Sequence, residues 1–146
     1  MKKVLEWLDV HSQWKNLIGI LVVVALFVAF GFRADRAGVR IAIEGDDFVI
    51  RYADQFETRF SKQNVQSVNL TEDLDYGSAV DAVSEEKYLV GAWENGEYGR
   101  YDLAVKKSVD ACIVVRTAEG VTVYNYDNKK QTEAAYDALI EWIEAE

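Results

Sequence analysis

Hydrophobic and polar residues alternate along most of the chain after position 38. In 39–44 every second residue is apolar, and the runs 48–52 and 56–60 repeat this alternation after short polar turns. A weaker run of the same kind covers 65–70. A period of two interrupted by short polar turns predicts antiparallel hairpins with one apolar face and one wet face.

Three further strands are predicted nearer the C-terminus. The stretch 101–105 alternates, whereas 111–117 is almost entirely apolar, which is typical of a central strand. A third run, 121–126, follows a glycine-containing turn. Together with the first group this gives four strands, a long irregular stretch over 71–99, and three strands.

The last segment changes to a helical period. Its apolar residues recur at intervals of three and four, with acidic residues opposite: Tyr136, Leu139, Ile140 and Ile143 against Glu133, Asp137, Glu141 and Glu144. This pattern predicts an amphipathic helix laid on the sheets, with Thr132 or Asn128 as its N-cap.

The N-terminal part is of a different kind. Positions 17–32 contain no charge, and as a helix they would span about 24 Å, slightly less than a bilayer core of about 30 Å. Trp14 and Arg33 extend the run to the two interfaces, where such residues prefer to lie. We therefore predict a transmembrane anchor with its flanks over 15–36, preceded by a short amphipathic juxtamembrane segment over 1–14.

Two questions about this anchor stay open at the level of sequence. The small residues around 29–31 are compatible with a cleaved signal peptide, but sixteen residues that are not simply basic precede the apolar core, which favours an uncleaved anchor at the cell membrane. Three lysines precede the span and three arginines follow it, so the positive-inside rule leaves the side of the soluble domain undecided.

Net charge limits the classes of partner that the remaining domain, 37–146, can bind. The whole chain carries a formal charge of −9, and from position 38 onward 22 acidic residues face 11 basic ones. Such a domain lacks the basic surface of a nucleic-acid binder and is repelled by anionic lipid. Cys112 is the only cysteine, so an intrachain disulfide is excluded.

The element order and one stretch of sequence resemble a known family. The run 91–126, with its Gly-x-Trp pair and aromatic strand start, is similar to bacterial pleckstrin-homology-like domains that follow N-terminal membrane spans; the matching positions are Gly91, Trp93, Tyr98, Gly99, Tyr101 and 113–115. The resemblance implies a mainly β fold: a two-sheet barrel of four plus three antiparallel strands, capped by the C-terminal helix.

The segment GAWENGEYGRYDL, 91–103, holds the candidate partner-binding residues Trp93, Tyr98, Gly99 and Tyr101. Loop aromatics usually pack on the edge of a core, which is the simpler interpretation here. The alternative is a protein or peptide contact surface, for which tryptophan and tyrosine are favoured residues.

The sequence gives little support for a catalytic or metal-binding function. His11 is the only histidine and lies in the N-terminal segment, so no Ser or Cys triad, zinc site or cofactor is predicted. The acidic run 71–77 is the best calcium candidate, although it lacks the EF-hand spacing. The loop 44–47 is acidic, which argues against phosphoinositide binding.

The sequence thus predicts a membrane-anchored, non-catalytic protein-interaction or scaffolding module, with another protein or peptide as its partner. The alternative is a carrier or sensor of a small apolar ligand or lipid, held between the two sheets by Tyr52, Phe60 and Tyr124.

Overall fold

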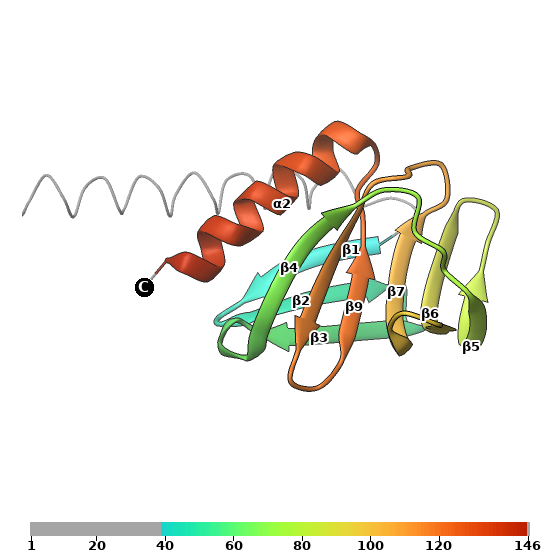
Figure 1. Ribbon diagram of the computed structural model, residues 1–146, viewed down its shortest axis with the longest axis horizontal. Coiled ribbons are helices and arrows are strands. Elements are labelled where there is room, and N and C mark those ends of the chain that lie inside the picture. Colours follow the sequence, from blue (N-terminus) through green and yellow to red (C-terminus); the bar gives the residue numbers. More distant parts are fainter. Residues whose placement is uncertain (1–38, 146) are drawn as a thin grey trace, which may run out of the picture.

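The computed structural model describes residues 39–145 of the 146-residue chain, which form two β-sheets and one long helix (Figure 1). In chain order the elements are β1 (Val39–Glu44), β2 (Asp47–Tyr52), β3 (Phe56–Ser61), the 3₁₀ helix η1 (Lys62–Asn64), β4 (Val65–Thr71), β5 (Ser78–Ser84), β6 (Tyr88–Asn95), β7 (Gly99–Lys106), β8 (Cys112–Thr117), β9 (Val121–Tyr124) and α2 (Lys129–Glu144).

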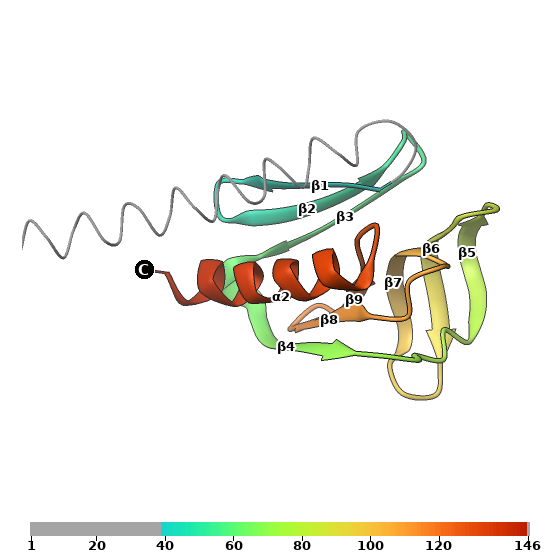
Figure 2. The same cartoon turned by 90° about the horizontal axis from the view of Figure 1, so that it is seen from above.

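The strands divide into a sheet of three and a sheet of six. β1, β2 and β3 form an antiparallel meander, and the larger sheet has the order β4-β8-β9-β7-β6-β5. All its pairs are antiparallel except β7 with β9. The strands of the two sheets cross at a steep angle in Figure 1, and Figure 2 shows them as two layers with α2 along the opening between them.

Stacked aromatic rings fill the space between the layers. The ring of Phe48 on β2 stacks on that of Phe60 with centroids 4.9 Å apart, and it lies 5.3 Å from that of Tyr124 on β9. Ala135, Ala138 and Leu139 of α2 complete this core. Thr58 of β3 adds a polar link between the sheets by donating a hydrogen bond to the Asp102 carboxylate of β7 at 2.6 Å.

The C-terminal helix begins with a side-chain cap. Asn128 accepts a hydrogen bond from the backbone N–H of Gln131 at 2.9 Å, which satisfies one of the free donors of the first turn. Thr132, the other predicted cap, is buried instead, and its hydroxyl accepts a hydrogen bond from the Tyr126 N–H at 3.1 Å.

The mainly β architecture with a C-terminal helix is confirmed, but the division into four plus three strands is wrong. η1 turns the chain out of the first sheet, so β4 pairs with β8 of the other sheet. The stretch predicted to be irregular, 71–99, contains two additional strands, β5 and β6. The sheets form two layers and do not close into a barrel.

The N-terminal predictions lie outside the described residues. Both the amphipathic segment 1–14 and the anchor 15–36 precede position 39, so their membrane role stays a prediction. Within 39–145 no helix combines the length and the apolar character needed to cross a bilayer.

One prediction follows from the core. The Tyr124 side chain is 0% exposed and its hydroxyl has no hydrogen-bond partner among residues 39–145, whereas the Tyr101 hydroxyl donates to the Tyr76 carbonyl at 2.7 Å. Tyr124→Phe is expected to raise the free energy of unfolding by about 1 kcal/mol, because it removes an unsatisfied polar group. The matched change Tyr101→Phe should lower it by about 1–2 kcal/mol. Urea denaturation of both variants tests the pair; a destabilised Tyr124→Phe protein contradicts the expectation.

Candidate functional site

The six-stranded sheet is apolar on both faces. One face belongs to the core described above, and the other carries a second buried cluster: Trp93, Tyr101, Leu103, Val105, Cys112, Val114 and Val123. The segment 72–77, which joins β4 at one edge of the sheet to β5 at the other, packs Leu74 and Tyr76 against this cluster. We call 72–77 the connector.

The four candidate partner-binding residues lie in and beside this second cluster. Trp93 on β6 and Tyr101 on β7 are cross-strand neighbours, and their side chains are only 8% and 3% exposed. Tyr98 is half-buried, with its ring edge-on to that of Tyr101 at 5.5 Å and the Arg116 guanidinium 4.9 Å above it, while Gly99 is exposed. This burial favours the packing interpretation of the aromatic residues.

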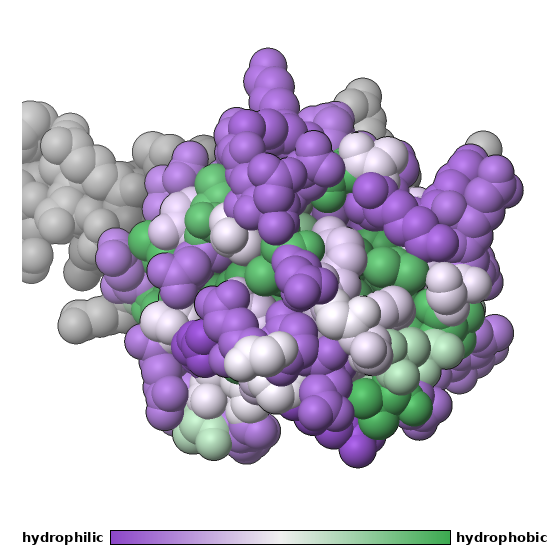
Figure 3. Space-filling view, turned by 45° about the vertical axis from the view of Figure 1, so that its right-hand side comes forward, coloured by the Kyte–Doolittle hydropathy of each residue, from purple (hydrophilic) through white to green (hydrophobic). Residues whose placement is uncertain are grey.

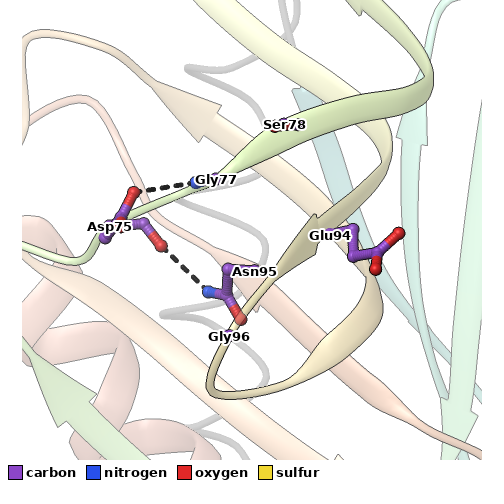
Figure 4. A pocket seen from close by; sticks show the side chains of 6 residues that line it. All are labelled: Asp75, Gly77, Ser78, Glu94, Asn95 and Gly96. Atoms are coloured by element: carbon purple, nitrogen blue, oxygen red, sulfur yellow. Dashed lines mark hydrogen bonds between the residues drawn. The ribbon is translucent and has the colours of Figure 1, made fainter.

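Hydrogen bonds fasten the connector to the β6–β7 turn. The Asp75 carboxylate accepts from the Gly77 N–H at 2.9 Å, and the Asn95 side-chain amide donates to the Asp75 carbonyl at 2.9 Å (Figure 4). The Asn95 side-chain oxygen also accepts from the N–H of Tyr98 at 2.7 Å. Asn95 therefore holds together two segments that lie about twenty residues apart in the sequence.

Two glycines allow the chain to approach β6 closely. A Cβ on Gly77 would lie 2.0 Å from the Glu94 carbonyl oxygen, and one on Gly91 would lie 2.5 Å from the Asp81 carbonyl oxygen. Both have positive φ, 76° and 125°, which a side chain disfavours. Gly77 thus permits the connector to contact β6, and Gly91 permits β5 to do so.

The connector and the turn border an open depression of about 530 Å³, lined by Asp75, Gly77, Ser78, Glu94, Asn95 and Gly96. The Asp75 carboxylate accepts the hydrogen bond from the Gly77 N–H, and the Glu94 side chain points away from that carboxylate (Figure 4). Within the described residues no three His, Cys, Asp or Glu side chains gather in a way that could hold a metal ion. The geometry therefore adds nothing to the calcium hypothesis for 71–77.

The single cysteine is enclosed. Cys112 is 0% exposed, its sulfur lies 3.5 Å from the Tyr76 hydroxyl, and burial raises the pKa of its thiol. A thiol that is both protonated and covered is a poor nucleophile. Cys112 is part of the packing under the connector.

Negative charge is concentrated at this end of the molecule. Eight acidic residues and one lysine lie between positions 72 and 97, whereas the other described residues include thirteen acids and ten bases. All eight acids are exposed: Glu72, Asp73, Asp75, Asp81, Glu85, Glu86, Glu94 and Glu97. In Figure 3, which brings this end forward, hydrophobic side chains reach the surface among hydrophilic ones; Val80, 47% exposed, is the large apolar residue most open to solvent in the described chain.

These acids differ from those on the three-stranded sheet. There, Arg51 pairs with Glu44 and with Glu57, in each case at 2.7 Å, and Arg59 pairs with Glu57 at 2.6 Å. Among the eight acids of 72–97, only Glu72 forms an ion pair within the described residues, with Lys129. The connector, β5, β6 and the β6–β7 turn thus form a surface of uncompensated charge, which we call the acidic end.

The interpretation of the sequence missed this surface, although its charge can be counted directly in 72–97. The missing information was structural: without β5 and β6, those acids belong to a solvated loop rather than to one edge of a sheet. Comparisons with known proteins supply no further guide, since no family model, curated protein or solved structure matches the chain.

The close contact of Gly77 with β6 can be tested directly. Gly77→Ala is expected to lower the free energy of unfolding by about 2 kcal/mol or more, because the new Cβ meets the Glu94 carbonyl in a strained conformation. Gly96→Ala is the matched control, since a Cβ there meets nothing within 4 Å. Thermal unfolding of both variants gives the comparison, and equal midpoints would rule out the proposed constraint.

Tyrosine burial predicts loss of stability at alkaline pH. Burial, followed by a hydrogen bond to Glu85, raises the pKa of Tyr52 to about 12, and burial also raises the pKa values of Tyr76 and Tyr101. The unfolded chain releases these protons near pH 10 while the folded one keeps them. The stabilisation is therefore complete below about pH 10 and is lost as the pH rises above it. Tyrosinate absorbance, which reports ionisation, and circular dichroism, which reports folding, should change together as the pH rises. Full ionisation of the tyrosines near pH 10 in a domain that is still folded would contradict the prediction.

Proposed function

We propose that this protein is a non-catalytic protein-interaction module, held at the cell membrane by residues 15–36, and that the acidic end is its contact surface. The observation that carries the proposal is the charge pattern. Seven of the eight exposed acids between positions 72 and 97 have no ion-pair partner within the described residues, although the ion pairs on the three-stranded sheet show that the fold uses such pairs elsewhere.

Uncompensated charge on one side of a domain has a physical consequence. Repulsion among the acids costs stability, and the gain is a field that speeds the approach of an oppositely charged partner and orients it. The same charge repels anionic lipid headgroups and nucleic acid. A basic protein segment is therefore the partner class that fits this surface.

A catalytic role has little support in the described residues. Cys112 is buried and protonated, and the described residues offer no metal-binding cluster. His11, the only histidine in the sequence, lies before the described domain. These observations favour a binding function.

The alternative of an apolar carrier draws no support from the core. The Phe48 ring packs against those of Phe60 and Tyr124, two of the three residues expected to line a cavity, with ring centroids 4.9 and 5.3 Å away. Tyr52 packs its ring against that of Tyr88 at 6.1 Å. The relation to bacterial pleckstrin-homology-like domains stays a prediction, and the six-stranded order β4-β8-β9-β7-β6-β5 departs from the sheets that it implied.

The proposal is tested by isolating partners from membranes with the full chain. Replacing Glu94 and Glu97 by glutamine removes two charges from the acidic end, and specific partners are expected to be recovered several-fold less, as quantified by mass spectrometry. The matched control replaces Asp54 by asparagine and Glu119 by glutamine, two exposed acids that lie outside the acidic end. Wild-type and control chains should recover the same partners; recovery that is equal for all three chains would refute the acidic end as the contact surface.

A further inference from the structure

β5 leaves one side of the larger sheet open. Among the strands that the structure describes, Ser78–Ser84 pairs with β6 on one side only, and β5 is the last strand of the sheet. The opposite edge strand, β4, is contacted by α2, whereas β5 lies far from that helix in both ribbon views (Figures 1 and 2). Its first four residues are all exposed to solvent. An exposed strand with unpaired backbone groups is a template on which another extended chain can pair.

The register identifies the backbone groups that are free. The Glu85 N–H donates to the Tyr88 carbonyl at 3.0 Å, and the pairs Ser84↔Leu89, Val83↔Val90 and Ala82↔Gly91 follow in order. Antiparallel pairs alternate between bonded and non-bonded, so Val83 bonds to β6, whereas the N–H and C=O groups of Ala82 and Ser84 point outward. Two residues of β5 thus present donors and acceptors to an incoming strand.

We propose that β5 accepts a lysine- or arginine-rich extended segment of a partner protein as an additional strand. The inference rests on the proposed function, because it assigns the acidic end as the contact surface and adds how contact is made. Backbone hydrogen bonds at Ala82 and Ser84 hold the segment in place. Asp81 lies next to them on the same strand, and Glu85 and Glu86 follow it. Opposite charges on neighbouring strands stabilise the pairing, which selects a basic segment.

A second copy of this chain fits the edge poorly. Asp81 is the middle residue of the seven-residue strand, so two copies of β5 paired about a two-fold axis in full register would place Asp81 opposite Asp81. Like charges directly opposite one another destabilise a strand pair. The ladder also shifts register between Ala79 and Asp81, and such a bulge interrupts regular pairing. Both features discourage self-association and leave 81–84 as the regular part of the edge.

Exposed Val80 extends the contact. It lies at the register shift and is 47% exposed, so an apolar side chain of the incoming strand can cover it. An extended chain places successive side chains on opposite faces, so a basic residue can meet Asp81 while an adjacent residue lies over the other face. The expected ligand therefore alternates basic with small or β-branched residues.

Fluorescence anisotropy with the full chain in uncharged detergent micelles tests the proposal. The probe is a labelled synthetic peptide of alternating lysine and threonine, and its counterpart replaces lysine by glutamate. Wild-type chains should bind the lysine peptide and not the glutamate peptide. Asp81→Lys is expected to weaken binding about tenfold, which corresponds to about 1.4 kcal/mol. Glu119→Lys, a similar charge change at an exposed turn between β8 and β9, should leave the affinity within about twofold of wild type.

The backbone contribution needs separate variants. Ala82→Pro removes an outward N–H without breaking the β5–β6 ladder and is expected to abolish binding. Because proline can also disturb folding, a lysine peptide with N-methylated alternate residues is measured on the wild-type chain, where it too should fail to bind. Hydrogen exchange at Ala82 and Ser84 should slow when the unmodified peptide is added.

The outcomes separate this inference from the proposed function. If the lysine peptide binds equally with or without N-methylation, the acidic end attracts charge but adds no strand, and the inference is overturned while the contact surface stands. If the lysine peptide does not bind the wild-type chain, but the recovery of partners from membranes still depends on Glu94 and Glu97, only the inference about β5 is overturned. Dimers that Ala82→Pro abolishes in sedimentation experiments would show that the edge pairs with its own copy.

Discussion

The six-stranded sheet has two apolar faces, and the rest of the domain is arranged to cover both. The three-stranded sheet and α2 cover one face, with Phe48 at the centre of the packing. The connector 72–77 covers the other by crossing the sheet from β4 to β5. Six residues leave little slack for this crossing, because an extended chain covers about 3.3 Å per residue, so attachment at the far end keeps the segment on the sheet. The hydrogen bonds of Asp75 and Asn95, and the close contact at Gly77, supply that attachment.

This constraint explains why the aromatic residues of 91–103 are separated from the surface that we propose as the contact site. Trp93 and Tyr101 are needed beneath the connector, and their burial removes them from solvent. The hairpin of β5 and β6 exposes the edge strand β5 and its acidic side chains to solvent. The additional hairpin contributes its inward-facing residues to packing, and it carries four exposed acids, none of which forms an ion pair within the described residues. Packing and the proposed recognition therefore use different sides of the same two strands.

The elements that could be predicted from sequence are those with strong local periodicity. β1, β2 and β3 alternate cleanly, β8 is apolar throughout its first four residues, and α2 shows a full helical stripe, so each was found within a few residues. β5 and β6 lack such a signal because β5 is a mostly exposed edge of small residues and Gly91 interrupts β6. What stabilises them is pairing over distance: β7 supports β6, and Gly91 allows β5 to approach. Such partners are invisible in a local window.

An open sheet edge normally promotes aggregation, and the features around β5 disfavour pairing with an identical strand. A bulge at one end and a central aspartate disfavour pairing with an identical strand. Proline, the most effective block, is absent from the whole sequence, and β5 contains no lysine. In the proposed pairing, the acids that repel a second copy attract a basic strand, so a single charge pattern would both disfavour aggregation and select a partner. If the edge were only being protected, lysine or proline would serve as well as aspartate. The excess of five acids over one lysine from β5 through the β6–β7 turn is what protection alone does not explain.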